Sequence, residues 1–237
     1  MISFTYRSNE KELLDRNDIP FKDIKRNMQE LEFINRRLGG HEITLDGIVS
    51  ILSNHYNFNK PLCITEIGCG GGDNLKAIER WAAHTHVPVK LTGIDINKEC
   101  IAYALMQSDS IEFICSDFRD VGFTEKPHIV FSSLFCHHFT NEEITAMLIW
   151  MKKNSALGFF INDLHRHPAA YYSIKWLTAV FSKSYLVKND APISVKRGFT
   201  RCDWNNFFSD AGIEDFNCTW RWAFRWLVSF SHGNQNL

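Results

Sequence analysis

From residue 62 onward, the chain alternates short apolar runs with amphipathic stretches of helical period. The apolar runs are 62–67, 89–96, 111–115, 129–134 and 157–161, and the helical stretches between them are 73–83, 97–107 and 140–152. Such alternation is typical of parallel strands joined by helical crossovers. Thr140 and Glu143 have the spacing of a capping box at the start of the third helical stretch. The sequence therefore predicts an α/β fold with a doubly wound sheet.

The C-terminal part departs from this alternation. Thr200 and Asp203 begin a predicted helix that Gly212 ends, and two predicted strands with a short connection follow. In the second strand, large apolar residues occupy every other position: Trp220, Trp222, Phe224, Trp226, Val228 and Phe230. A connection this short cannot be a parallel crossover, so we expect an antiparallel last strand. We interpret the stripe as a buried core face, not a membrane-interface belt or a base-stacking platform, with Arg221 and Arg225 on the wetter face.

The N-terminal residues read as helices. Apolar residues at 21, 24, 28, 31, 34 and 38 form one stripe at helical spacing, Gly39 and Gly40 end that helix, and Thr44 caps a second, shorter one. We predict an N-terminal helical cap over 1–58 and a core domain over 59–237, with a helical lid near 168–190.

Composition excludes several classes of protein. Lysine and arginine total 26 against 27 acids, so the basic excess expected of a nucleic-acid binder is missing. The start of the chain lacks the apolar core of a signal peptide, and the apolar windows are too short to span a bilayer. The 7 cysteines never show C-x-x-C spacing, which argues against a zinc framework or disulfides. We expect a cytoplasmic protein with no nucleic-acid partner and no stable membrane insertion.

A glycine-rich loop over 66–72, Glu-Ile-Gly-Cys-Gly-Gly-Gly, follows the first strand directly and precedes a helix. Glycines let a backbone turn sharply and approach a ligand closely. The dinucleotide fingerprint G-x-G-x-x-G requires glycine where this chain has Asp73, and no Gly-Lys-Ser/Thr of a P-loop follows. The loop therefore predicts a ligand site that is neither of these two.

Carboxylates follow the ends of three successive predicted strands. Glu66 belongs to the glycine loop, Asp95 ends the second strand, and Asp117 follows the third, next to Phe118. The carboxyl edge is where doubly wound sheets bind their ligands. Asp95 is placed to accept hydrogen bonds from ribose hydroxyls, and Asp117 from an adenine amino group.

This combination resembles class I S-adenosylmethionine-dependent methyltransferases over about residues 60–230. The resemblance implies a Rossmann-like seven-stranded sheet with an antiparallel last strand, and S-adenosylmethionine (SAM) as the cofactor, with S-adenosylhomocysteine as its product. It also implies that the glycine loop lines the methionine end, that Asp95 binds the ribose, and that Asp117 and Phe118 hold the adenine. The cofactor-binding residues expected on this basis are Glu66, Gly68, Cys69, Gly70, Gly72, Asp95, Ile96, Asp117, Phe118 and Ser133.

The histidines that follow the fourth and fifth strands are candidate catalytic residues: His137, His138 and His165. Histidine titrates near neutral pH, so either ring of the 137–138 pair is suited to take the proton of a phenol or hydroxyl. The alternative is that one ring orients the loop and the other caps the next helix. Asp163, His165 and His167 could ligate a metal, but magnesium prefers oxygen ligands and the acid cluster of catechol-type methyltransferases is missing. We therefore expect no metal, and place Asp163 in the substrate pocket.

The helix predicted after Pro168 carries apolar residues around nearly its whole circumference. Tyr171 and Tyr172 belong to it and are expected in the substrate pocket. Such a helix is buried on several sides or covers a ligand, and a dimer interface is the alternative. We expect a monomer or homodimer.

Flanking motifs at 12–15, 34–40, 162–166 and 194–200 resemble bacterial quinone-biosynthesis-type methyltransferases, in particular those associated with type III polyketide synthases. The resemblance implies O- or C-methylation of a phenolic, polyketide or lipid-like small molecule in secondary metabolism, by in-line displacement. Two alternatives remain: a protein or RNA methyltransferase, and a catalytically silent interaction subunit with a cofactor fold.

Overall fold

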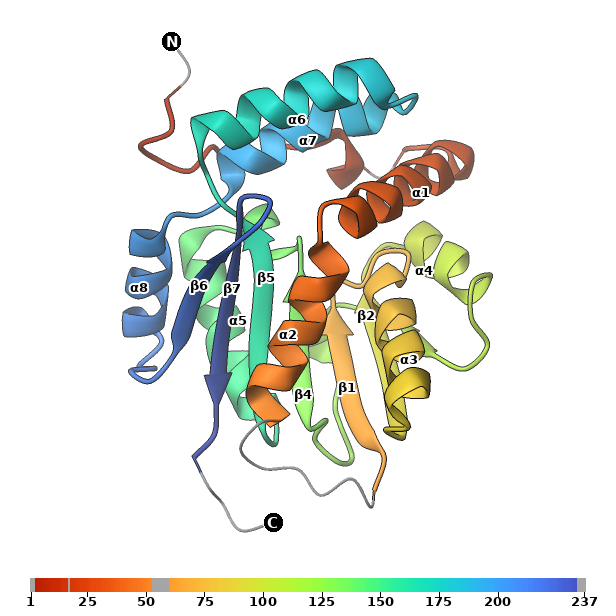
Figure 1. Cartoon of the computed structure of the whole chain (residues 1–237), viewed down its shortest axis with the longest axis vertical. Coiled ribbons are helices and arrows are strands. Elements are labelled where there is room, and N and C mark those ends of the chain that lie inside the picture. The colour runs from red at the N-terminus through yellow and green to blue at the C-terminus, as the bar shows by residue number, and fades with distance from the viewer. Residues whose placement is uncertain (1–2, 17, 53–59, 234–237) are drawn as a thin grey trace.

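The fold is a single seven-stranded sheet with helices on both faces (Figure 1). A computed structural model describes residues 3–16, 18–52 and 60–233. The strand order is β3-β2-β1-β4-β5-β7-β6, and β7 is antiparallel to both of its neighbours. The strands are β1 (Leu62–Ile67), β2 (Val89–Asp95), β3 (Glu112–Cys115), β4 (Ile129–Ser133), β5 (Gly158–Leu164), β6 (Asn217–Arg221) and β7 (Arg225–Ser231). The predicted doubly wound sheet with an antiparallel last strand is confirmed.

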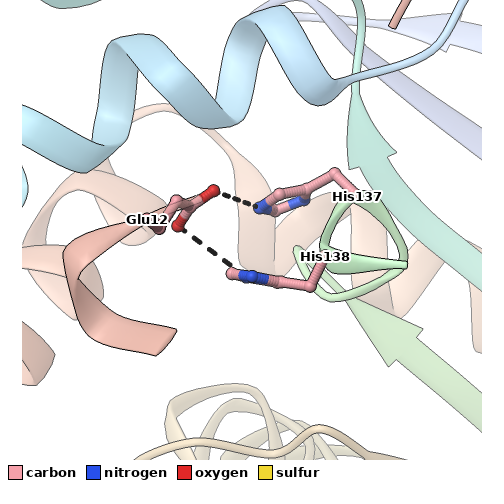
Figure 2. A group of neighbouring side chains, drawn as sticks. All are labelled: Glu12, His137 and His138. Carbon is pink, nitrogen blue, oxygen red and sulfur yellow. Dashed lines mark ion pairs between the residues drawn. The ribbon is translucent and has the colours of Figure 1, made fainter. Parts of the chain in front are cut away.

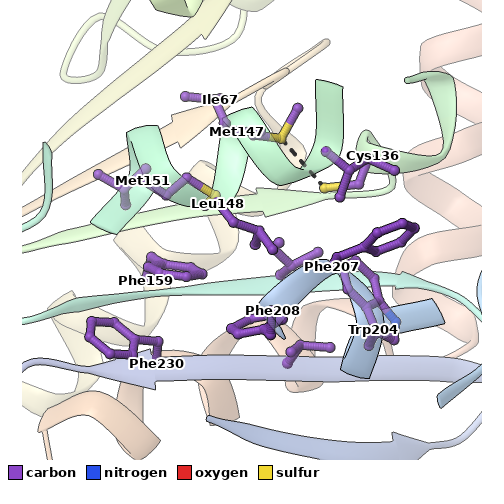
Figure 3. Close-up of a cluster of buried hydrophobic side chains, with 14 of the residues drawn as sticks. Ile67, Cys136, Met147, Leu148, Met151, Phe159, Trp204, Phe207, Phe208 and Phe230 are labelled. Carbon is purple, nitrogen blue, oxygen red and sulfur yellow. Dashed lines mark hydrogen bonds between the residues drawn. The ribbon is translucent and has the colours of Figure 1, made fainter. Parts of the chain in front are cut away.

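Two helical layers enclose the sheet. On one face lie α2 (Gly40–Leu52) and α3 (Asp73–Thr85), whose apolar residues form one core with β1, β4 and α4 (Lys98–Leu105). On the other face, α5 (Asn141–Asn154) and α8 (Arg201–Asp210) form a second core, shown in Figure 3. Trp204, Phe208 and Phe159 are fully buried there. Capping boxes at Thr140 and Thr200 begin α5 and α8, in agreement with the sequence.

A third group of helices lies beyond the carboxyl ends of the parallel strands (Figure 1). It comprises α1 (Phe21–Arg37), α6 (Pro168–Phe181), α7 (Tyr185–Arg197) and the short 3-10 turns η1 (Leu13–Asp15), η2 (Phe118–Asp120) and η3 (Cys136–His138). The predicted N-terminal segment thus divides: α1 lies over the carboxyl edge, whereas α2 packs on the sheet. Residues 53–58 of that segment lie outside the described residues. Among the described residues, no helix is long and apolar enough to cross a bilayer.

Three local predictions were wrong. Thr44 does not cap α2, which begins four residues earlier; its hydroxyl donates to the carbonyl of Gly40 within the helix. The aromatic stripe is not one strand, because residues 222–224 form a hairpin turn between β6 and β7 that leaves Trp220 and Trp222 exposed. Arg225 lies on the face opposite Trp226, as the alternation predicts, but that face is not wet. Arg225 is buried, with 3% of its surface exposed, because α2 packs against that face of β7.

We predict that Gly47→Ala lowers the free energy of unfolding by about 1–3 kcal/mol, although alanine is the better helix former. A Cβ at Gly47 in α2 would lie 2.5 Å from the ring of Phe160, which is fully buried and has no room to withdraw. Urea denaturation measures the effect. Gly122→Ala, where an added Cβ meets nothing within 4 Å, is the control. Equal stability of the two variants would show that α2 does not press on β5.

Candidate active site

The glycine loop turns at the carboxyl end of β1 and is held by β2. The backbone N–H groups of Gly68 and Cys69 donate to the carbonyl of Ile94, and Gly70 N–H donates to Asp95 Oδ2 at 2.8 Å. Gly68, Gly70 and Gly72 have φ of +68°, +50° and +74°, a region that favours glycine. The other oxygen of Asp95 accepts from Asn97 N–H. Asp95 therefore ties the loop to the end of β2, and each of its oxygens retains a further lone pair.

Apolar side chains lie against this loop. A Cβ on Gly68 would lie 2.2 Å from the ring of Phe135, and one on Gly70 would lie 3.5 Å from Met28 Sδ of α1. Met28 belongs to a small core with Ile24, Cys100 and Tyr103 that fastens α1 to α4. The N-terminal helix therefore covers the loop on one side.

Glu66 is fully enclosed behind the loop. Its Oε1 accepts a hydrogen bond from Asn74 Nδ2 at 3.0 Å, while its buried Oε2 has no partner. Burial raises the pKa of Glu66 well above its usual value, and the nearby carboxylate of Asp73 raises it further. An unpartnered buried acceptor of this kind is costly in a folded protein, and such atoms gather at ligand sites.

Arg225, at the start of β7, is an unpartnered buried cation close to the same place. Its Nη1 has no hydrogen-bond partner and lies 2.9 Å from the position of a Cβ on Gly40, next to Asn35 Oδ1, which is also unpartnered. Burial lowers the pKa of Arg225 to about 10, and the carboxylates of Asp163 and Asp73 oppose that shift. The amide of Asn35 donates to Asp73 Oδ2 at 2.8 Å, which connects this group to the start of α3.

The expected adenine residues lie farther along the edge. Ile96 follows Asp95 and leaves 70% of its surface exposed, an apolar surface beside the predicted ribose carboxylate. Asp117 accepts from Arg119 N–H and forms an ion pair with the Arg119 side chain. Phe118 is buried, with its ring 5.0 Å from the ring of Trp150 in a T-shaped contact. Contact of Asp117 and Phe118 with an adenine stays a prediction.

The two histidines after β4 lie in η3, and both rings are held by carboxylates. His137 Nδ1 lies 2.8 Å from Asp163 Oδ1, and His138 Nδ1 lies 3.1 Å from Asp15 Oδ1. Their Nε2 atoms both face Glu12, at 3.6 Å and 3.9 Å from its two carboxylate oxygens (Figure 2). Glu12 is 5% exposed and His137 is 3% exposed. The structure thus unites five ionisable groups from three distant parts of the chain.

Residues 7–15, here called the N-terminal strap, are fastened over η3. Arg197 Nε donates to the carbonyl of His137 at 2.8 Å, and its Nη2 donates to that of His138 at 2.6 Å. Arg7 also donates to the carbonyl of His137, at 3.3 Å. Asp190 of α7 accepts from Leu13 N–H and Leu14 N–H, which holds η1 in place. The strap, α7 and the histidine turn therefore form one connected unit.

The remaining predicted residues have mixed surroundings. His165 lies near the β6–β7 hairpin, accepts from Trp220 Nε1 at 3.2 Å, and has a pKa lowered to about 4 by burial, so it is a weak base. Asp163 has no exposed surface and contacts His137 directly, so it orients that ring. Tyr171 packs on Phe4, whereas Tyr172 is 58% exposed on the outer face of α6. Ser133 is buried with an unpartnered Oγ.

Glu12, Asp15 and Arg225 are the site residues that sequence reasoning missed. The first two lie more than a hundred residues before the histidines, and no local pattern connects them. For Arg225, the signal was its position at the start of the last strand, beside the carboxyl end of β5.

We predict that Arg225→Met raises the thermal stability of the ligand-free protein. A guanidinium whose pKa falls in the folded state costs stability at every pH below about 10, on the order of 3 kcal/mol here, and methionine of similar length removes that cost. Differential scanning calorimetry at pH 7 measures it. Arg221→Met is the control, because Arg221 pairs with Asp46 at the surface. A lower melting temperature for Arg225→Met than for Arg221→Met would refute the unpaired state of Arg225.

Comparison with known proteins agrees with this geometry. Residues 64–154 match the family model of a methyltransferase domain. No curated protein sequence matches the chain. Similar solved structures include magnesium protoporphyrin IX methyltransferase from Synechocystis with bound SAM (TM-score 0.55, 13% identity, 92% of this chain and 100% of that one). A plantazolicin methyltransferase with bound S-adenosylhomocysteine has TM-score 0.57 and 18% identity, covering 84% of this chain and 80% of that one.

Human N-acetylserotonin methyltransferase with bound SAM has a TM-score of 0.63 and 17% identity, covering 91% of this chain and 57% of that one. At these identities, the likeness of the structures concerns the fold. The matched domain begins in β1, contains the glycine loop and the histidine turn, and ends with α5. Residues 64–154 therefore match a methyltransferase domain model, and the sheet that contains them has the Rossmann-like fold of the similar methyltransferase structures.

Proposed function

We propose that this protein transfers a methyl group from SAM to a small phenolic, polyketide or lipid-like acceptor. The observation that carries the proposal is that the glycine loop and the histidine turn share one edge of the sheet. Burial raises the pKa of Asp95, whereas the N–H groups of Asn97 and Gly70 and the charge of His138 lower it. His138 is thus within electrostatic range of the carboxylate expected at the ribose.

The unpartnered polar atoms at this edge suit the amino-acid end of SAM. Glu66 Oε2 can accept from an ammonium group, and Arg225 can pair with a carboxylate. Asp95 retains lone pairs for ribose hydroxyls, and Ile96 offers an apolar surface for the adenine. When bound, SAM supplies a methyl carbon on a sulfonium that is already activated for displacement.

The residues of this chain then position the acceptor, exclude water and remove its proton. The strap and α7 cover the histidine turn, which limits the entry of water. Asp163 and Asp15 hold the Nδ1 atoms of the two rings. Nε2 is therefore the nitrogen of each ring that is left to accept the proton of an acceptor hydroxyl. In-line displacement requires little more than this positioning.

Several features support a small acceptor. Glu12 of the strap and His137 beneath it are both buried, where a folded protein or RNA duplex does not reach. The similar structures include magnesium protoporphyrin IX and N-acetylserotonin methyltransferases, both enzymes of small molecules. The quinone-biosynthesis-type motifs of the sequence favour a phenol within that class. A monomer or homodimer in the cytoplasm is part of the same proposal.

We predict that Asp95→Ala weakens SAM binding by about tenfold or more, because the loop loses a charged hydrogen-bond partner and the ribose loses its acceptor. His138→Ala should lower turnover while SAM affinity changes little. Isothermal titration with S-adenosylhomocysteine and a turnover assay separate the two effects.

Asp109→Ala, at an exposed aspartate outside the site, is the control for the loss of a carboxylate. Equal losses of cofactor affinity in Asp95→Ala and His138→Ala would contradict the separate roles given to these residues.

For the acceptor, we predict that methyl-labelled SAM incubated with the protein and an extract of its source cells gives label in the organic-soluble fraction, and that Asp95→Ala abolishes it. A small apolar product partitions in this way because it lacks charge. Scintillation counting after solvent extraction measures the label, and mass spectrometry identifies the product. Label confined to protein or RNA would contradict the small-molecule class, and binding of SAM without any transfer would favour the silent-subunit alternative.

A further inference from the structure

The cluster of Glu12, His137 and His138 has the arrangement of a metal site. One ligand atom from each residue lies within 4.8 Å of the other two. The two Nε2–Oε distances are 3.6 Å and 3.9 Å, longer than hydrogen bonds. Bonds of about 2.0–2.2 Å from a tetrahedral zinc ion separate neighbouring ligand atoms by about 3.4 Å, so the spacing is that of ligands around an ion.

The hydrogen bonds of the two rings point to the same conclusion. A neutral imidazole that donates its Nδ1–H to a carboxylate presents a lone pair at Nε2. Asp163 accepts from His137 and Asp15 from His138, so both lone pairs then face the carboxylate oxygens of Glu12 (Figure 2). Acceptors that face one another in a buried site repel each other unless a cation lies between them.

Every candidate ligand also has an outer partner. Carboxylates orient both histidines, and Ser194 Oγ donates to Glu12 Oε1 at 2.8 Å. Metal-binding histidines almost always donate their other ring N–H to such a group. The carboxylates of Glu12, Asp15 and Asp163 gather around two rings that are uncharged when they bind a metal, which favours a divalent cation.

We propose that Glu12, His137 and His138 bind Zn²⁺. Two histidines and a glutamate form a known catalytic zinc set, which leaves a fourth position open to an oxygen ligand. The site also joins the N-terminal strap to the turn after β4, so the ion holds the strap over the carboxyl edge. This is not the site considered from sequence, because His165 and His167 lie at the β6–β7 hairpin.

The role of the ion in catalysis rests on the proposed function. An acceptor hydroxyl at the open position loses its proton to solvent more readily, because zinc lowers the pKa of a bound oxygen. The oxygen lone pair then forms a bond to the methyl carbon, and the carbon–sulfur bond breaks with its electron pair passing to sulfur. With zinc on both Nε2 atoms, the ion replaces direct proton transfer to a histidine, and the zinc-bound oxygen, not carbon, is the methylated atom.

The test titrates Zn²⁺ into chelator-treated full-length protein against a chromogenic competitor. We expect one zinc ion per chain in the wild type, a rise in melting temperature with zinc, and loss of both effects in Glu12→Gln and His138→Gln. Asp163→Asn should weaken zinc binding about 10–100-fold through the orientation of His137.

Glu10→Gln is the matched control on the strap, since Glu10 pairs with Lys196, and His84→Gln controls for an exposed histidine. Visible absorption of the Co²⁺-substituted protein, lost in Glu12→Gln, provides a readout that needs no activity. Absence of stoichiometric binding, or equal zinc affinity in Glu12→Gln and Glu10→Gln, would overturn the site. Zinc binding without methyl transfer would leave the site intact and refute the proposed function alone.

Discussion

The buried contact between His137 and Asp163 is the interaction on which the geometry of the candidate site depends. Asp163 has no exposed surface, and its Oδ1 accepts from His137 and from the backbone N–H of Leu164. Burial alone would raise the pKa of Asp163, but its contact with His137 lowers that pKa below the usual value. The contact joins the ends of the neighbouring strands β4 and β5, and it places the ring of His138 beside that of His137, 4.4 Å between centroids. Glu12 of the strap then contacts both rings, and Asp15 contacts that of His138.

The parts of the fold that depend on local pattern could be predicted from sequence. The five parallel strands, β1 to β5, begin and end within three residues of their expected positions. Apolar runs and capping boxes are local signals that lie within a single helix or strand. Predictions failed where contacts between segments distant in the sequence determine the local structure. Thr44 has the residue type of a cap, but the helix begins at Gly40, where any side chain would collide with Asn35 and Arg225. Arg225 is buried because α2, a distant segment, covers the face of β7 on which Arg225 lies. Glu12 contacts the histidines only because the fold brings the N-terminal strap over the turn after β4.

Unpartnered buried polar atoms are concentrated at this edge of the molecule. Among the described residues, Asn35 Oδ1, Glu66 Oε2, Ser133 Oγ, Asp163 Oδ2 and Arg225 Nη1 are buried without a partner. The two apolar cores on the sheet faces consist mainly of fully buried apolar side chains such as Phe131 and Phe160, stacked at 4.9 Å, and Trp204 Nε1 is buried there without a partner. The sheet and its helices therefore stabilise the fold, whereas the unpartnered polar atoms lower its stability at the edge where ligands are expected to bind. The glycine loop alone does not explain this distribution, since Asn35 and Arg225 come from opposite ends of the chain.

The apolar composition of α6 says less about the acceptor than its sequence suggests. Trp176 and Phe181 of this helix are 64% and 69% exposed, so much of its aromatic surface faces away from the sheet. The element that closes over the histidines is the strap, which is polar and is held by Asp190, Arg7 and Arg197. An acceptor that reaches the histidine turn must therefore satisfy charged and hydrogen-bonding groups on that side. Within the proposed function, this favours a phenol that presents a hydroxyl to the cluster over a wholly apolar chain, and it assigns the selection of the acceptor to the strap and not to the outer helix.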